Sequence, residues 1–320
     1  MLCQKRVRRR EWLPLKRERV SGGVVASSAW SQTRSLTRSA HSLRSLALLP
    51  HSPLHSLAPL PRPAPTPSSL APHSLRRAQF WIHGGCYVEG TPNDALYNGS
   101  NIIAAARAAG LVPPVVVATA YRLNVLGFLG GAEELRARDP KRGSAGNYGI
   151  QDQRAAMEWT RDNVAAFDGD PKRVFVWGQS AGAGSVAVHL VTKPSWPLFA
   201  RAGMESGSFA NWIAYNWDAA ANNYNRTLAA VGCADLACLL ATNVTLLTKM
   251  VTNLSPPCRD GCAWAPTVDG VEMTDYPWRL LEKGHHARGK AILHGTQLDD
   301  GSDFMNEVSP LPPQATDKVG

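Results

Sequence analysis

The chain has 320 residues and a formal net charge of +9, but the excess positive charge lies in its first quarter. Residues 1–78 hold 14 of the 34 Lys and Arg residues and two of the 25 Asp and Glu residues, whereas residues 79–320 have a net charge of −3. This distribution argues against a nucleic-acid-binding domain that is basic throughout. No apolar run approaches the ~20 residues that a membrane-spanning helix needs, so we expect no membrane span.

Residues 1–78 are predicted to form a disordered, basic segment rich in Ser, Pro and Arg. Nine of the 23 prolines fall there, and proline at that density blocks helices and removes hydrogen-bond donors from strands. Few aromatic or β-branched residues remain to offset the entropy of ordering. Three interpretations stay open: an organelle transit peptide, a tail that binds nucleic acid or a membrane surface, and a low-complexity extension without specific function. A secretory signal peptide fits poorly, because the apolar stretch 46–50 is short and begins late.

From residue 79 onward, segments typical of strands alternate with segments typical of helices. Strands are predicted at residues 78–83, 115–120, 174–177 and 291–294, with a weaker strand pattern at 201–205. The segment 115–120 is a continuous apolar run, which is typical of a strand buried on both faces. The clearest helical patterns cover residues 102–109 and 150–167. This alternation predicts an α/β domain with a mostly parallel central sheet and helices on both faces. In such sheets the chemistry is expected beyond the carboxyl ends of the strands.

A G-x-S-x-G motif at residues 178–182 follows the strand at 174–177 directly and precedes a run of small and apolar residues at 183–191. In that context the motif predicts a strained strand-to-helix turn that lifts the hydroxyl of Ser180 above the sheet. The N-terminus of the following helix favours negative charge beside it. Ser180 is therefore a candidate nucleophile, and the alternative is a glycine-rich turn that carries a surface serine.

Acyl transfer also needs N–H groups aimed at the developing oxyanion. Ala181 supplies one such N–H, and the glycine-rich loop at residues 83–87, at the end of the first strand, is placed to supply the others. Within this loop His83 is expected to be a packed loop histidine, because this architecture places the catalytic base last in the chain. Cys86 has a second interpretation as a reactive thiol.

Several stretches, taken in order, resemble the type-B carboxylesterases and cholinesterase-like proteins of the α/β-hydrolase fold. They are residues 80–90, 115–129, 146–153, 163–171, 198–208 and 299–302. The resemblance covers about residues 79–305 and implies that residues 79–320 form an incomplete α/β-hydrolase domain. It also implies a serine carboxylic-ester hydrolase that forms an acyl-enzyme with a small-molecule ester and uses no cofactor and no metal. The oligomeric state is not indicated.

Carried over by position, the resemblance makes Ser180 the nucleophile and Asp300 the acid of the catalytic triad, with the oxyanion-hole donors at Gly85, Cys86 and Ala181. The family usually has Glu at the position of Asp300, and on sequence alone this aspartate is equally well a solvated turn residue. Cys86 stands where the family has glycine, so its N–H is kept but a Cβ crowds the hole. Gln179 replaces the usual glutamate, which makes a preference for choline esters doubtful.

The catalytic base is missing from the expected place. The triad order in this fold is Ser, acid, His, but no histidine follows Asp300. His189 lies nine residues past Ser180 on the expected helix, about 13 Å away at the helical rise, and the remaining histidines precede the acid. We therefore expect half an active site with impaired activity, since loss of a triad histidine costs on the order of 10⁶ in turnover. The alternative is a non-catalytic cholinesterase-like binding or adhesion protein.

Paired cysteines and glycosylation sequons bear on the cellular compartment. The segment Cys233 to Cys238 resembles a small disulfide loop of the family, and Cys258 and Cys262 form a second candidate pair. A four-cysteine zinc site and reduced core thiols are the alternatives. Candidate N-glycosylation sites are Asn98, Asn225, Asn243 and Asn253. Together these features favour a secretory compartment, although the N-terminal segment fits a transit peptide better than a signal peptide.

Overall fold

The computed structural model describes residues 25–27, 75–139, 143–252 and 264–300. The predicted disorder of residues 1–78 concerns mainly residues 1–24 and 28–74, which lie outside the described residues. Cys258, Cys262 and Asn253 lie outside them too. Within residues 1–78 the structure describes a three-residue strand at 25–27 and the start of the next strand at Arg76.

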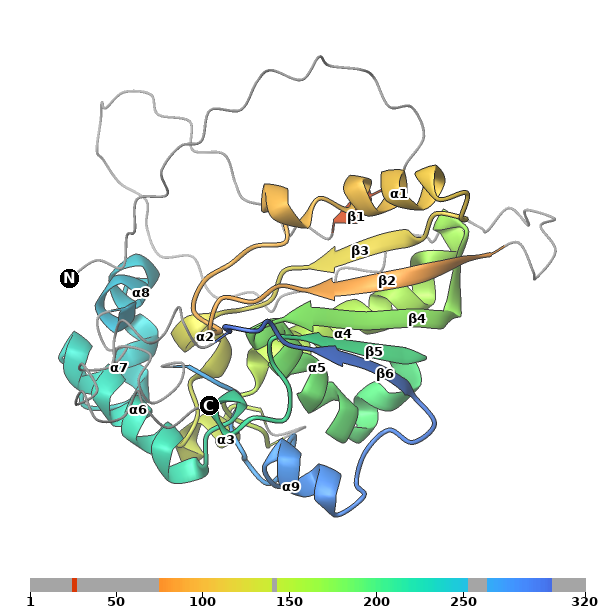
Figure 1. The fold of residues 1–320 in the computed structure, drawn as a ribbon. Coiled ribbons are helices and arrows are strands. Elements are labelled where there is room, and N and C mark those ends of the chain that lie inside the picture. The colour runs from red at the N-terminus through yellow and green to blue at the C-terminus, as the bar shows by residue number, and fades with distance from the viewer. Residues whose placement is uncertain (1–24, 28–74, 140–142, 253–263, 301–320) are drawn as a thin grey trace, which may run out of the picture.

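A six-stranded sheet forms the centre of the molecule (Figure 1). Its strand order is β1-β3-β2-β4-β5-β6, and every neighbouring pair is parallel. The strands are β1 (Val25–Ser27), β2 (Arg76–Ile82), β3 (Val115–Thr119), β4 (Gly169–Gln179), β5 (Arg201–Glu205) and β6 (Ala291–Gly295). This arrangement confirms the predicted α/β class with a parallel sheet.

Helices lie on both faces of the sheet. On one face, α1 packs so closely on β3 that a Cβ added at Gly99 would lie 2.8 Å from the side chain of Val116. The other face is covered by α4 and α5 (Figure 1). The helices are α1 (Gly99–Ala108), α2 (Asn124–Phe128), α3 (Glu133–Ala137), α4 (Tyr148–Asn163), α5 (Ala181–Val191), α6 (Trp217–Val231), α7 (Leu236–Ala241), α8 (Val244–Thr252) and α9 (Pro277–Glu282). None of the described helices combines the length and the apolar character that crossing a bilayer requires.

The core lies between the sheet and α5. All eleven residues of α5 are buried, which explains why its sequence is small and apolar on every side. Val174 and Val176 of β4 are 1% and 0% exposed. All five residues of β3 are buried as well, as expected for a strand covered on both faces. The strand–turn–helix unit that carries Ser180 is therefore anchored in the best-packed part of the molecule.

Candidate active site

Ser180 lies at a sharp turn between β4 and α5. Its backbone has φ 54° and ψ −123°, a conformation that costs a non-glycine residue on the order of 1–3 kcal/mol. Two backbone hydrogen bonds hold this geometry: the N–H of Ser180 donates to the carbonyl of Glu205 at 2.9 Å, and the N–H of Gly184 donates to the carbonyl of Ser180 at 3.0 Å. The Ser180 side chain is half-buried, so the turn presents it at the carboxyl edge of the sheet.

The two glycines of the G-x-S-x-G motif are required by close packing. A Cβ added at Gly182 would lie 2.1 Å from the carbonyl oxygen of Ile82, at the end of β2. A Cβ added at Gly178 would lie 2.6 Å from the backbone of Gly182. Any side chain at either position would push the turn away from β2, so glycine here brings the turn and the end of β2 into contact.

The glycine-rich loop after β2 begins in contact with this turn. A Cβ added at Gly84 would lie 2.7 Å from the carbonyl oxygen of Gln179 and 3.0 Å from the Cβ of Ser180. The next three residues, Gly85, Cys86 and Tyr87, all have positive φ, at 108°, 52° and 59°. Successive residues of this kind curl the backbone into a tight concave turn, a geometry that can gather N–H groups around an anion.

His83 fixes the start of this loop through contacts with Gly84 and Tyr121. Its side chain is 1% exposed, and its Nδ1 lies 2.8 Å from the carbonyl oxygen of Gly84. The hydroxyl of Tyr121 donates to the carbonyl of His83 at 2.8 Å, and the two rings stack with their centroids 4.5 Å apart. Burial lowers the pKa of His83, so the ring is neutral at physiological pH.

His189 lies in α5 and is fully buried. Its Nδ1 lies 2.9 Å from the hydroxyl of Ser195, and its Nε2 lies 3.0 Å from Oε1 of Gln153. Burial, together with the positive charge of Arg154, lowers the pKa of His189 to about 3. Both ring nitrogens are occupied by structural partners, which makes His189 a packing residue.

No histidine in the described ranges is hydrogen-bonded to Ser180. Three of the described histidines lie near the C-terminal end: His294 is exposed on β6, while His285 and His286 lie in the turn after α9. The ring of His285 lies 5.5 Å from that of Trp196. The proton acceptor of a triad is therefore not assembled by the residues that the structure describes.

Asp300 lies on the segment that follows β6. Its Oδ2 accepts a hydrogen bond from the N–H of Gln297 at 3.1 Å, a contact that closes a local turn. The parallel pairing of β5 and β6 continues into a hydrogen bond from the N–H of Ser206 to the carbonyl of Gly295, at 2.9 Å. Asp300 thus follows a strand whose carboxyl end lies at the same edge of the sheet as Ser180.

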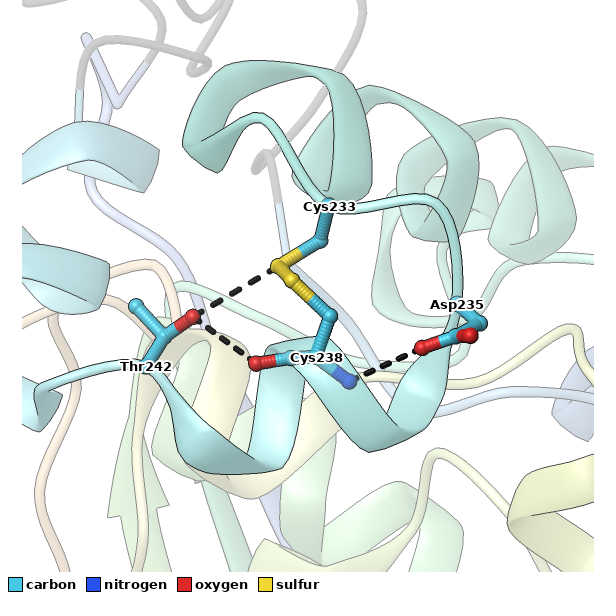
Figure 2. Close-up of a disulfide and its surroundings, with 4 residues drawn as sticks. All are labelled: Cys233, Asp235, Cys238 and Thr242. Carbon is cyan, nitrogen blue, oxygen red and sulfur yellow. Dashed lines mark hydrogen bonds between the residues drawn. A yellow bond between two sulfur atoms is a disulfide. The ribbon is translucent and has the colours of Figure 1, made fainter.

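Cys233 and Cys238 form a disulfide between α6 and α7, with their Cα atoms 5.5 Å apart (Figure 2). Asp235 accepts a hydrogen bond from the N–H of Cys238 at 2.8 Å, and the hydroxyl of Thr242 donates to the carbonyl of Cys238 at 3.1 Å. Because their sulfurs are bonded to each other, these two cysteines do not offer the thiolates that a four-cysteine zinc site would need. Among the candidate glycosylation sites, three lie in the described residues, and all three are exposed: Asn98, Asn225 and Asn243.

Comparison with known proteins places this site in a family. The profile of the carboxylesterase family matches residues 67–318. The chain belongs to the carboxylesterase family. This confirms the resemblance to type-B esterases, and the members of the family are carboxylic-ester hydrolases.

The chain is also similar to individual proteins in sequence and in structure. The chain is 32% identical over 251 residues to a cholinesterase from Mus musculus, a match that covers 76% of this chain and 38% of the relative. It is 36% identical over 238 residues to secreted lipase 1 from Botryotinia fuckeliana, covering 70% and 40%. The crystal structure of carboxylesterase EST55 from Geobacillus stearothermophilus at pH 6.2 superposes with a TM-score of 0.62 and 33% identity, covering 73% of this chain and 46% of that one. The chain thus spans about two fifths of the length of these curated relatives.

Two contacts of the site were not predicted from the sequence. The carbonyl of Glu205, which anchors the N–H of Ser180, belongs to a neighbouring strand, and a main-chain group carries no sequence signal. Tyr121 anchors the loop through the carbonyl of His83, from a position 38 residues further along the chain. The glycine pair at 84–85 was the available signal for close approach, and it is Gly84 that lies against Ser180.

Proposed function

We propose that this chain carries the nucleophile and the oxyanion-binding elements of a serine carboxylic-ester hydrolase that acts through an acyl-enzyme. The observation that carries the proposal is the contact between the strained turn at Ser180 and the glycine loop at Gly84. Two segments nearly a hundred residues apart meet where a hydroxyl and main-chain N–H groups are needed together. Membership of the carboxylesterase family supports the same chemistry.

In the proposed first step, Oγ of Ser180 attacks the acyl carbon of a small-molecule ester. The Oγ–C bond forms, the carbonyl oxygen takes up negative charge, and the hydroxyl proton passes to a base. The N–H of Ala181, in the first turn of α5, has no acceptor within its own helix and points at the oxyanion together with the helix dipole. The N–H groups of Gly85 and Cys86 are its proposed partners. The C–O bond to the alcohol then breaks as the oxyanion returns to a carbonyl, and the proton taken from Ser180 passes to the leaving alcohol. In a second step water hydrolyses the acyl-enzyme, which releases the carboxylic acid and restores the hydroxyl of Ser180.

Proton transfer is the step that this chain supports least. Both His83 and His189 are buried, with lowered pKa values, and neither is hydrogen-bonded to Ser180. We propose Asp300 as the triad acid, but no described histidine bridges it to the serine. For the residues that the structure describes we propose water as the proton acceptor, and with water in this role we expect turnover lower by a factor on the order of 10⁶ than in a complete triad.

The substrate class follows from the groups around the turn. Gln179, which precedes Ser180, has its Oε1 3.0 Å from the position of a Cβ on Gly84, so an uncharged amide occupies the space between loop and turn. A neutral amide gives no electrostatic preference for a cationic alcohol group. We therefore propose neutral carboxylic esters as the substrates rather than choline esters.

The test is covalent labelling of the full chain with a fluorophosphonate probe, in the presence and absence of imidazole as an external base. We expect slow labelling that imidazole accelerates, loss of labelling in Ser180→Ala, and unchanged labelling in Ser100→Ala, an exposed serine on α1. Peptide mapping would locate the label. Labelling that persists in Ser180→Ala would contradict the assignment of the nucleophile.

A non-catalytic binding protein is the second candidate, and one observation favours it: Ser180 has no hydrogen-bonded histidine within the described part of the chain. The same experiment separates the two functions. If the wild-type chain stays unlabelled even at high imidazole, while remaining folded by circular dichroism, the hydrolase proposal fails and the binding function is supported.

A further inference from the structure

A chain of buried hydrogen bonds runs from the segment after α5 back to the first residue of α5. The four side chains that form it are each 0% exposed: Gln153, Ser185, His189 and Ser195. Gln153 belongs to α4, and Ser195 belongs to the 3₁₀ helix η4 (Lys193–Leu198). Ser185 and His189 are four residues apart on α5, so they lie on the same face of that helix. Side chains withdrawn from bulk water in this way have to find their partners among protein groups.

A backbone carbonyl at one end fixes the direction of the first two bonds. The hydroxyl of Ser185 lies 3.0 Å from the carbonyl oxygen of Ala181, which carries no hydrogen, so the hydroxyl is the donor. Oγ of Ser185 is then free to accept, and Nε2 of Gln153 donates to it at 3.1 Å. The amide of Gln153 is thereby oriented, and its Oε1 is left as an acceptor on the other side.

The same direction continues through the histidine. His189 has a pKa of about 3, so its ring is neutral at physiological pH and only one of its nitrogens carries a proton. Nε2 lies 3.0 Å from Oε1 of Gln153, which can only accept, so Nε2 is the protonated nitrogen. Nδ1 therefore accepts from the hydroxyl of Ser195 at 2.9 Å. The carbonyl of Ala181 thus sets one direction for the whole chain.

The chain ends at the residue whose N–H is the proposed oxyanion donor. Two planar peptide groups flank the Cα of Ala181. The first contains this N–H and the carbonyl of Ser180, which accepts from the N–H of Gly184 at 3.0 Å. The second contains the carbonyl of Ala181, which accepts from the hydroxyl of Ser185. Because both peptide planes are held by their carbonyls, the direction of the N–H between them is fixed as well.

We propose that this chain positions the N–H of Ala181 for the oxyanion, and that Gln153, at its centre, is a positioning residue of the site. The inference rests on the proposed role of Ala181 in acyl transfer. Gln153 acts through Ser185: it holds the hydroxyl that in turn holds the carbonyl of Ala181. An oxyanion donor stabilises the transition state most when it is aimed in advance, because it then pays no cost of reorientation during the reaction.

Labelling kinetics of the full chain separate positioning from binding. The fluorophosphonate concentration is varied at a fixed concentration of imidazole, which gives the half-saturation constant KI and the maximal rate kinact separately. We expect Ser185→Ala and Gln153→Met each to lower kinact about tenfold and to leave KI unchanged, since a misdirected donor weakens the transition state alone. The double variant should be no slower than the slower single variant, because both substitutions break the same chain. Ser185→Ala is the smaller change and decides the outcome if Gln153→Met does not fold.

Thr160→Val, on α4, is the matched control. The side chain of Thr160 is also 0% exposed, and its hydroxyl donates to a carbonyl four residues back, that of Ala156, at 2.8 Å. This bond is of the same kind as the bond from Ser185 to Ala181 but lies outside the chain. We expect Thr160→Val to keep the wild-type kinact. Equal losses of kinact in Thr160→Val and Ser185→Ala, or wild-type rates in both chain variants, would overturn the proposal.

Hydrogen–deuterium exchange makes the test independent of the proposed function. Peptides that cover residues 180–186 report on the first turn of α5 whether or not Ser180 reacts. We expect a several-fold faster exchange of this turn in Ser185→Ala and Gln153→Met, and wild-type exchange in Thr160→Val. If the wild-type chain stays unlabelled, the hydrolase proposal fails and exchange alone decides the positioning role. Faster exchange in the two chain variants then supports that role, and unchanged exchange overturns it.

Discussion

The turn at Ser180 and the segment after β6 lie at the same edge of one sheet, but their surroundings differ sharply. Around Ser180, glycines fit against the backbone of β2 and all of α5 is buried. In contrast, β6 is exposed throughout, and Asp300, which follows it, is held by one local hydrogen bond among the described contacts. Ser180, the proposed nucleophile, is thus supported by non-local packing, whereas Asp300, the proposed acid, depends on a short turn.

This difference follows from how each element is enclosed. Strained backbone persists only when the surrounding structure determines it, and the neighbours of Ser180 come from β2, β5 and α5. Among the described residues, β6 pairs with β5 alone, and all five of its residues are exposed. In the proposed site Ser180 is therefore held firmly and Asp300 loosely, and the pairs of substitutions below measure that contrast.

The largest expected effect is on stability, when a glycine beside Ser180 is replaced by alanine. The same replacement at the end of β6 is the comparison. Gly182→Ala would place a Cβ 2.1 Å from the carbonyl oxygen of Ile82, so we expect a loss of about 3 kcal/mol or more in the free energy of unfolding. Gly295→Ala, at the end of β6, meets no atom within 4 Å and should change that free energy by less than about 0.5 kcal/mol. Urea denaturation measures both, and equal losses would show that the two regions are equally packed.

The sequence predicts the elements around Ser180 well because their signals are local. The strand patterns locate β3 and β5 to within a residue, and the motif at 178–182 locates the turn. β4 begins at Gly169, five residues before its apolar run, because pairing with β2 extends the ladder into polar residues. α1 begins at Gly99, three residues early, because the Asn98 side chain caps its first turn by accepting from the N–H of Ser100.

Other parts of the structure could not be predicted from local patterns. α6 has no clear local signal, because its asparagines are weak helix formers. It is stabilised by burial of Tyr224 and Leu228 and by the side chain of Asn216 at its start. The contact between Gly84 and Ser180 depends on β2 lying beside β4, which is known only once the strand order is known. Asp300 was assigned through the family resemblance, since nothing in its immediate sequence sets it apart from Asp299.

Low pH should lower the stability of the well-packed region around α5, because His189 is buried there. Its pKa is about 3 in the folded chain, against an ordinary value of 6.5, because burial and Arg154 disfavour the charged ring. Below pH 6.5 the unfolded chain takes up a proton that the folded chain refuses, so stability is lost as the pH falls from about 6.5 toward 3. The expected slope is up to about 1.4 kcal/mol per pH unit.

The measurement for His189 is urea denaturation at several pH values from 7 to 4. His189→Gln should flatten the dependence, because it removes the buried titrating ring, and His294→Gln on exposed β6 is the control. If His189→Gln has the same pH dependence as the wild-type chain, another buried group must be responsible for the acid sensitivity.

The disulfide tests whether stability and the proposed chemistry are separable. It joins residues five positions apart, and for so short a loop we expect its removal by Cys233→Ser with Cys238→Ser to cost about 2 kcal/mol. The bridge lies between α6 and α7, so labelling of Ser180 should be unchanged under conditions where the variant is folded. A fall in the labelling rate of the folded variant would mean that α6 and α7 help to position the turn.

The smallest effect is expected at Asp300. Asp300→Asn keeps an oxygen that can accept from the N–H of Gln297, so the free energy of unfolding should change by less than about 0.5 kcal/mol.

The same substitution at Asp269, which is 3% exposed, provides the contrast. One carboxylate oxygen of Asp269 accepts from three successive N–H groups, at residues 271–273, and the other accepts from the hydroxyl of Ser144 and from the N–H of Ala145. We expect Asp269→Asn to lower the free energy of unfolding by about 1–3 kcal/mol. The NH₂ group of the asparagine would replace an accepting oxygen and would face the N–H and O–H donors that now bind it. A comparable loss at Asp300 would show that this carboxylate is held as firmly as Ser180, and the contrast between these two parts of the proposed site would disappear.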